Sequence, residues 1–367
     1  MSGDIILVIV VGTALAFDFT NGFHDTANVV ATSISTRAIG PKPAVAMASL
    51  LNFVGAFISL KVADTVAQGF VDPHAVTTTV VFAGLIGAIA WNLITWALGL
   101  PSSSSHALVG GLVGSVIAAE GTSAVNGAGL LGKLIVPAIV APIVAFIVAG
   151  LAILLVYKIV GRLRPGPVSR GFRLGQLASG GLLALSHGTN DAQKTMGVIT
   201  LALVAHGDIS SSSFQVPEWV VIAAASSIAA GTFTGGWRII KTLGTRIISM
   251  DPAQGFAAQG AGAAVILAAS SAGYPLSTTH VISGGIMGAG AAKSVSAVRW
   301  GVAGNIVAAW ILTLPAAGLF GAIVYGVASL FGTGATGPLL ITLLLLGALA
   351  MVLMRRAQQA TPSPVAS

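Results

Sequence analysis

The chain consists of long apolar segments separated by short polar loops, and this pattern limits the folds that are open to it. A helix needs roughly 20 apolar residues to cross the hydrocarbon core of a bilayer, which is about 30 Å thick. The segments lie at 4–36, 43–60, 75–99, 102–119 and 130–157, then at 174–205, 219–237, 253–273, 276–292 and 300–328, with one more at 338–354. The pattern predicts an all-α, multi-pass integral membrane protein.

Charged residues are too scarce for a water-soluble fold. They make up 7% of the 367 residues, against 55% hydrophobic residues, whereas soluble domains carry roughly 25% charged residues. The segments are long and rich in Ala, Leu, Ile and Val, unlike the short alternating strands of a transmembrane barrel. The basic residues cluster in a few loops, so the net charge of +7 indicates membrane orientation and no nucleic-acid partner. The chain has no cysteine, which excludes disulfides and thiolate chemistry.

Corresponding loops in the two halves carry opposite charge. The loop after the first segment contains Arg37 and Lys42, whereas its counterpart at about 206–218 has no Lys or Arg. In the next pair of loops the basic excess lies in the second half, at 238–251, and not at 61–74. Because basic loops stay on the cytoplasmic side, the two halves are predicted to insert in opposite orientations.

We therefore expect two inverted-topology repeats of about five segments each, in the cell (cytoplasmic) membrane, with the N-terminus outside. The two short, glycine-rich segments, 102–119 and 276–292, either span the membrane or re-enter it as helical hairpins. The expected divisions are a first repeat at 1–157, a basic cytoplasmic linker at 158–173, a second repeat at 174–328, an extra span at 338–354 and a polar tail at 355–367.

One polar motif occurs in each half, within an otherwise apolar segment. The motif Asn21–Asp25 in the first half corresponds to His187–Asp191 in the second. Asn-Gly and His-Gly favour breaks in helices, so each segment is predicted to form two half-helices joined by an unwound stretch. A carboxylate at membrane depth is costly and usually functional. Asp25 and Asp191 are therefore predicted to form one site at the interface of the repeats.

A second polar motif is also duplicated, and it consists of a proline followed by a cluster of hydroxyl residues and a histidine. Pro101 and Pro275 precede the two clusters, and proline is favoured at helix starts. A helix N-terminus with free N–H groups and nearby hydroxyls binds anions without Lys or Arg. The six hydroxyls that we expect to face a small oxyanion belong to Ser103, Ser104, Ser105, Ser277, Thr278 and Thr279.

The two motifs together predict ion-coupled transport. An anion near Asp25 and Asp191 meets two negative charges in a medium of low dielectric constant, so compensating positive charge must accompany it. Cation-coupled symport supplies this charge as Na⁺, as H⁺ or as a metal–anion complex. Lys194, three residues after Asp191, either neutralises that carboxylate or takes part in the site. His106 and His280 are expected to be structural, and we expect no fixed structural metal site.

At these motifs the chain resembles the inorganic phosphate transporter (PiT) family, especially its bacterial low-affinity members. The resemblance rests on Phe17–Asn28, on His187–Gly197 and on the Pro-x-Ser-x-x-His pair at 101–106 and 275–280. It covers nearly the whole chain in order and spacing. It implies an inverted-repeat fold and phosphate symport coupled to Na⁺ or H⁺, with Mg²⁺ or another divalent metal able to travel with the phosphate as a neutral complex.

The resemblance also assigns residues to the site. It implies that Asp25 and Asp191 contact both ions and that the hydroxyls at 103–105 and 277–279 hold phosphate oxygens. The coupling-ion site is expected to comprise Asn21, His24, Asp25, Thr26, Asn28, Asn190 and Asp191. Many members of the wider family carry Gly-Ala-Asn-Asp where this chain has Gly-Phe-His-Asp. The coupling ion therefore stays open, since a histidine at position 24 is compatible with proton coupling.

Several alternatives stay open at the level of sequence. A sulfate permease could use the same scaffold, although Asp25 and Asp191 favour a protonatable anion such as phosphate. An intramembrane serine hydrolase built on Ser105, His106 and Asp25 is disfavoured because the cluster is duplicated and lacks a Gly-x-Ser-x-Gly elbow. We expect a transporter without an enzymatic activity or resident cofactor. Whether it works as a homodimer is not determined by the sequence.

Overall fold

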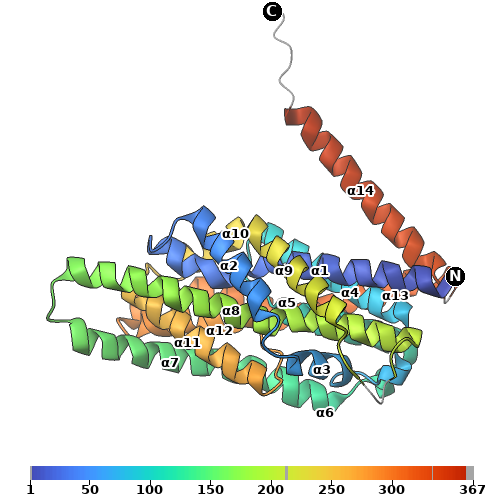
Figure 1. Ribbon diagram of the computed structural model, residues 1–367, viewed down its shortest axis with the longest axis horizontal. Coiled ribbons are helices and arrows are strands. Elements are labelled where there is room, and N and C mark those ends of the chain that lie inside the picture. Colours follow the sequence, from blue (N-terminus) through green and yellow to red (C-terminus); the bar gives the residue numbers. More distant parts are fainter. Residues whose placement is uncertain (1, 211–213, 333, 361–367) are drawn as a thin grey trace, which may run out of the picture.

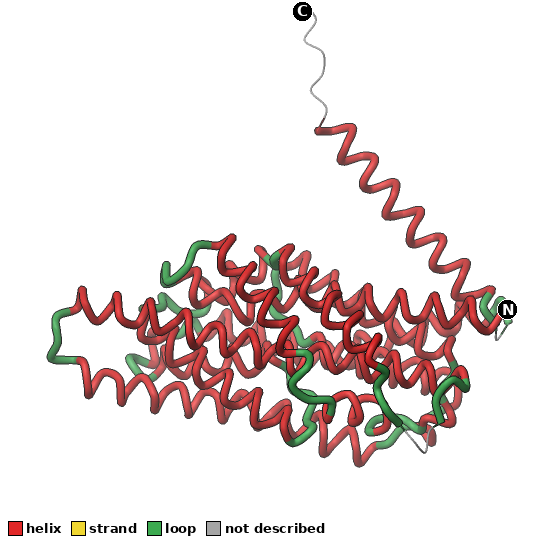
Figure 2. The backbone as a smooth tube through the Cα atoms, viewed as in Figure 1, coloured by secondary structure: helices red, strands yellow, loops and turns green. Residues whose placement is uncertain are grey.

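The computed structural model describes residues 2–210, 214–332 and 334–360. This part of the chain is nearly all helical, as Figure 2 shows, and its β-structure is limited to an isolated bridge between Val71 and Val125. The helices of the first half are α1 (Ser2–Ser35), α2 (Pro41–Gly55), α3 (Lys61–Gln68), α4 (Thr78–Leu98), α5 (Ser104–Glu120), α6 (Gly127–Leu130) and α7 (Val136–Val160). A π-helical turn at Leu131–Ile135 joins α6 to α7.

The second half contains a corresponding series of helices. These are α8 (Pro165–His206), α9 (Glu218–Thr234), α10 (Trp237–Lys241), α11 (Pro252–Ser271), α12 (Thr278–Ala291) and α13 (Trp300–Ser329). A π-helical turn at Thr242–Arg246 extends α10. The last helix, α14 (Thr336–Ala360), projects away from the bundle formed by the others (Figure 1).

Several helices are long and apolar enough to cross a membrane. In the described residues these are Gly3–Ser35, Thr78–Leu98, Gly127–Val160 and Trp300–Ser329, to which Glu218–Thr234 and Trp237–Arg246 add one bent pair with an angle of 59°. Helix α8 does not satisfy this test, although all its residues from 186 to 203 are buried. This buried stretch packs against other helices, and it contains polar residues such as Asn190, Asp191 and Lys194 that an apolar span lacks.

The two halves repeat the same packing. Helix α13 packs on α4 and α5, and α7 packs on their counterparts α11 and α12. Likewise α1 packs on α9, and α8 packs on α2. In Figure 1, α1 starts beside the N-terminus and α8 starts at the opposite end of the bundle, so these two helices run in opposite directions. The orientation of each half relative to the membrane stays a prediction.

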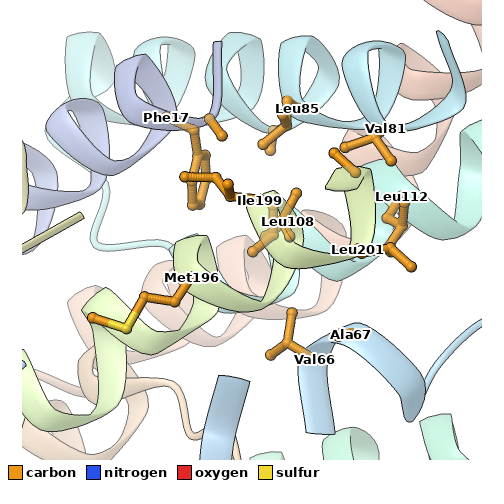
Figure 3. Packing of buried hydrophobic residues seen from close by; sticks show 14 of the residues in the cluster. Phe17, Val66, Ala67, Val81, Leu85, Leu108, Leu112, Met196, Ile199 and Leu201 are labelled. Atoms are coloured by element: carbon orange, nitrogen blue, oxygen red, sulfur yellow. The ribbon is translucent and has the colours of Figure 1, made fainter. Parts of the chain in front are cut away.

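Two clusters of buried apolar residues leave a polar layer between them. Along α1 the first cluster ends at Phe17 and the second begins at Ala27. Along α8 the second cluster ends at Ala184 and the first resumes at Ala192. Figure 3 shows part of the first cluster, where Phe17 and Ile199 lie next to each other. The polar residues of α1 and α8 between these limits therefore lie in the middle of each helix.

The expectation that α1 and α8 are broken at the polar motifs is wrong. Both helices are continuous through Asn21–Asp25 and His187–Asp191. Their glycines serve close helix packing instead, because a Cβ at Gly22 would collide with the carbonyl oxygen of Ile228 on α9, and one at Gly188 would collide with that of Asn52 on α2. Glycine permits such close approach between membrane helices.

The helical interruptions lie elsewhere. Extended segments separate α4 from α5 and α11 from α12, and these precede the two hydroxyl clusters. The predicted loops 61–74 and 238–251 contain α3 and α10. Of the predicted linker 158–173, only residues 161–164 lie outside helices. Of the predicted tail 355–367, the first residues belong to α14 and residues 361–367 lie outside the described part of the chain.

Candidate functional site

The two predicted carboxylates lie together in the polar layer. One ligand atom each from Asp25, His187 and Asp191 lies within 4.8 Å of the other two. Asp25 is 2% exposed and Asp191 is fully buried. The first comes from α1 and the second from α8, so this site combines the two halves of the chain. Two carboxylates this close and this well buried require positive charge nearby.

The carboxylate of the first half is paired with a histidine. His24 Nδ1 lies 2.6 Å from Asp25 Oδ1. The other ring nitrogen, Nε2, lies 3.2 Å from the hydroxyl of Thr95 and 3.3 Å from that of Ser102. Those two hydroxyls are 2.7 Å apart and hydrogen-bonded to each other. The imidazole therefore links Asp25 to α4 and to the segment that precedes α5.

The carboxylate of the second half is paired with a lysine. Lys194 Nζ donates to Asp191 Oδ1 at 2.6 Å and to the carbonyl oxygen of Leu276 at 3.0 Å. The second carboxylate oxygen of Asp191, Oδ2, lies 3.4 Å from His187 Nε2. One oxygen of Asp191 thus accepts a hydrogen bond from the Lys194 ammonium group, while the other lies near the side chains of His187 and Asp25.

The hydroxyl clusters begin helices, as the sequence predicts. Ser103 is the N-cap of α5 and accepts a hydrogen bond from the backbone N–H of His106 at 3.1 Å. Ser277 caps α12 in the same way, with a distance of 3.3 Å to the nitrogen of His280. A capped helix start still has free N–H groups in its first turn and favours an anion there.

The two helix starts meet in the centre of the molecule. The rings of His106 and His280 contact each other edge to face, with centroids 4.8 Å apart. Ser105 Oγ donates to the carbonyl oxygen of Leu276 at 2.9 Å. Trp310 stacks on His280 at 4.0 Å. The histidines therefore hold the two hydroxyl clusters together, which agrees with the structural role expected for them.

The hydroxyl cluster of α12 also contacts the carboxylate layer. Asn28 Nδ2 donates to Thr278 Oγ1 at 3.2 Å and to Thr279 Oγ1 at 2.9 Å. Thr279 Oγ1 in turn lies 3.5 Å from Asp25 Oδ1. Ser104 Oγ, on α5, is buried and has no hydrogen-bond partner among the described residues. These side chains bring hydroxyl groups and carboxylates from the two halves into one region.

Other predicted site residues are engaged elsewhere or lack partners. Thr26 Oγ1 donates to the carbonyl oxygens of Gly22 and Thr232, and Asn190 Nδ2 donates to Ser270 and to the carbonyl oxygen of Tyr274. These bonds anchor α1 to α9 and α8 to α11. Asn21 is fully buried, and its amide has no hydrogen-bond partner in the described residues. It therefore lies in the polar layer with hydrogen-bonding capacity to spare.

Sequence reasoning missed two residues of this region. His187 was not predicted as a site residue because no second histidine lies at a metal-ligand spacing from it. Its position one helical turn before Asp191 could have indicated that the two side chains share a helix face. Asp18 is fully buried, and neither carboxylate oxygen has a hydrogen-bond partner in the described part of the chain. Its interacting neighbours are Thr195, Asp191 and Lys194. The centre of the bundle thus holds a third carboxylate.

Comparison with known proteins identifies the family. The phosphate transporter family matches residues 21–170 and 163–321. The chain belongs to this family. Members are transporters, so the protein is a multi-pass membrane transporter and not an enzyme.

Individual relatives agree with the family assignment. A probable low-affinity inorganic phosphate transporter of Mycobacterium tuberculosis is 53% identical over 327 residues, which cover 89% of this chain and 78% of that protein. Proteins of the same description from Rhizobium meliloti and Bacillus subtilis are 49% and 44% identical, and the matches cover 97% and 96% of them. They cover 89% and 88% of this chain.

A solved structure has the same fold. It is described as the sodium-dependent phosphate transporter and superimposes with a TM-score of 0.80 at 25% sequence identity. The match covers 89% of this chain and 99% of that one.

Proposed function

We propose that this protein imports inorganic phosphate across the cell membrane by cation-coupled symport. The observation that carries the proposal is the meeting of Asp25 and Asp191 beside the starts of α5 and α12. Helix starts attract an anion, and carboxylates attract cations or protons. A site that holds both kinds of group suits an anion that moves only together with positive charge.

The six hydroxyls predicted to bind phosphate differ in the hydrogen bonds that they already make within the protein. Ser103 and Ser277 cap their helices, and Ser105 is bonded to a backbone carbonyl. Ser104, Thr278 and Thr279 are the hydroxyls best suited to phosphate oxygens, together with N–H groups in the first turns of α5 and α12. Asp25 and Asp191 favour phosphate over sulfate, because a protonated phosphate can donate a hydrogen bond to a carboxylate.

The coupling ion is proposed to be a proton carried by the His24–Asp25 pair. The 2.6 Å contact between these side chains lets a proton be shared, and histidine changes its protonation near neutral pH more readily than other side chains. Na⁺ is the alternative, because the solved relative is described as sodium-dependent. Asp25, with the nearby Asn28 and Thr279, would then supply the oxygen ligands.

A divalent metal ion is a candidate for transport together with phosphate. The oxygens of Asp25 and Asp191 and the imidazole of His187 lie close enough to hold one ion, and Mg²⁺ commonly binds through one or two carboxylates plus phosphate oxygens. Phosphate would then travel as a neutral metal complex. Mg²⁺ would act here as a part of the substrate.

Transport requires that the site open to each side in turn. The proposed repeats at 1–157 and 174–328 would move against each other to open it, and the basic segment 158–173 would face the cytoplasm. Helix α12 has 14 residues, a rise of about 21 Å, which is shorter than the hydrocarbon core of about 30 Å. We propose that α5 and α12 re-enter the membrane and that α14 forms an extra span.

The proposal is tested by uptake of radiolabelled phosphate into proteoliposomes, with pH, Na⁺ and Mg²⁺ varied independently. We expect saturable uptake that an inward proton gradient drives and that sulfate inhibits poorly. Stimulation of uptake by Na⁺ at constant pH would identify Na⁺, and not the proton, as the coupling ion. A strict requirement for Mg²⁺ would identify the metal–phosphate complex as the transported species. Gradient-independent, non-saturable flux would overturn the symport mechanism.

A further inference from the structure

Asp25 and Asp191 are each followed, three positions later, by a polar residue, and this residue differs between the two halves. Asn28 follows Asp25 on α1, and Lys194 follows Asp191 on α8. Residues three apart lie on the same face of a helix. The corresponding positions of the two halves therefore hold a neutral amide in one case and an amine that can carry a positive charge in the other.

The surroundings of the Lys194 ammonium group are those of a bound monovalent cation. Its Nζ lies 2.6 Å from a carboxylate oxygen of Asp191 and 3.0 Å from the carbonyl oxygen of Leu276. Leu276 lies in the extended segment just before α12. A carboxylate and a carbonyl from unwound backbone are the kinds of oxygen with which transporters bind coupling cations.

The position of Lys194 is desolvated. Its side chain is 1% exposed, so protein groups take the place of water around the ammonium group. Its carboxylate partner is Asp191 on its own helix, and the oxygen of Asp191 that Lys194 does not hold lies 3.4 Å from His187 Nε2. Asp25 on α1 and Asp191 belong to the same buried group, so the ammonium group lies beside carboxylates from both halves of the chain.

The first half has no such fixed cation beside its carboxylate. Asn28 uses its amide to donate to Thr278 and Thr279, and the side chain nearest to Asp25 is the imidazole of His24. The segment that corresponds to Leu276 contributes Ser102, whose hydroxyl lies 3.3 Å from His24 Nε2. The first half thus has no covalently attached ammonium group beside its carboxylate, whereas the second half has one.

We propose that Lys194 is a tethered cation, whose ammonium group occupies the second-half cation position and removes the need for one transported cation. This inference rests on the proposed phosphate symport. It assigns exchangeable positive charge to the Asp25 side alone. A protein with Lys194 then moves one positive charge fewer per phosphate than a variant in which the position is neutral.

The test replaces Lys194 with the residue that the first half carries at this place. Lys194→Asn and the longer neutral Lys194→Gln are compared with Lys194→Arg and the unaltered protein in proteoliposomes. Charge moved per phosphate is obtained from the reversal potential at fixed phosphate and proton gradients. We expect both neutral variants to move one additional cation per phosphate and to be stimulated by Na⁺, while Lys194→Arg keeps the original ratio.

A second measurement does not depend on transport. Thermal unfolding of each purified variant is followed from 0 to 300 mM Na⁺, at constant ionic strength. A ligand that binds only the folded state raises its melting temperature, so Na⁺ should stabilise the neutral variants and leave Lys194→Arg unchanged. Li⁺ is tested in parallel as a second small monovalent cation.

The outcomes separate this inference from the proposed function. Failure of the unaltered protein to take up phosphate would count against the proposed function itself. With uptake intact, an unchanged charge ratio and no Na⁺ stabilisation in the neutral variants would overturn the tethered-cation role. A further outcome is that both neutral variants are unfolded or inactive even in Na⁺ and at low pH, while Lys194→Arg behaves like the unaltered protein. This result would make Lys194 a structural ion-pair residue and would also overturn the tethered-cation role.

Discussion

Helices α1 and α8 place a carboxylate in the same polar layer but give it a different partner. Asp25 is paired with His24, and Asp191 with Lys194, each at 2.6 Å. An imidazole can gain and lose a proton near neutral pH, whereas an ammonium group normally stays charged. Two halves with the same helix packing can therefore differ in function through a few side chains, with one half suited to coupling transport to a cation and the other to holding a fixed charge.

The largest expected effect comes from removing either carboxylate. Asp25→Asn removes the carboxylate next to His24, and Asp191→Asn leaves the buried Lys194 without its carboxylate. Because these carboxylates are proposed to bind the coupling charge, phosphate uptake should fall at least about 100-fold, which corresponds to about 2.7 kcal/mol. Uptake into vesicles with matched amounts of membrane-inserted protein checks this. Asp64→Asn, which changes an exposed carboxylate, is the control. Normal uptake by either buried variant would remove that residue from the mechanism.

The next effect concerns the glycines that bring the halves together. Gly22→Ala and Gly188→Ala place a methyl group against the backbone of α9 and of α2, respectively, and overpacking costs about 1–3 kcal/mol. Thermal unfolding in detergent should show a lower melting temperature for both. Gly12→Ala lies on the same α1 but meets no atom within 4 Å, so it should be neutral. Unchanged stability of both tight variants would contradict the close-packing role.

A smaller effect is expected from making the first half resemble the second at one position. His24→Asn introduces the residue found at the corresponding Asn190 and removes the titratable partner of Asp25. Uptake driven by a proton gradient should fall about 10-fold, which is the size of one hydrogen-bond contribution of about 1.4 kcal/mol. Phosphate exchange across the membrane without a gradient should persist. Equal loss of exchange and driven uptake would assign His24 to binding and not to coupling.

The smallest effect distinguishes the two serines at the start of α5. Ser104 Oγ has no partner in the described residues, so Ser104→Ala should raise the KM for phosphate a few-fold with little change in stability. Ser103→Ala removes an N-cap and should lower stability by about 1 kcal/mol. Kinetics and thermal unfolding of both variants check the assignment, and the reverse pattern of effects would contradict it.

Much of the architecture could be predicted because it depends on local patterns. Apolar runs of membrane length predicted the long helices, and Ser103 and Ser277 are the helix caps that their clusters indicate. The breaks predicted at Asn21–Asp25 and His187–Asp191 failed because the role of a glycine depends on its neighbours. Gly22 and Gly188 pack against other helices, and no local pattern specifies that contact.

The sequence by itself determined the membrane class, the duplicated motifs and the spacing of Asp191 to Lys194 and His187, since one helical turn decides which residues share a face. Only the tertiary structure decided which partners complete the site. His24 meets Ser102 and Thr95, Lys194 meets the backbone of Leu276, and the two carboxylates meet each other. These contacts join segments that are distant in the chain, so they arise from how the two halves pack.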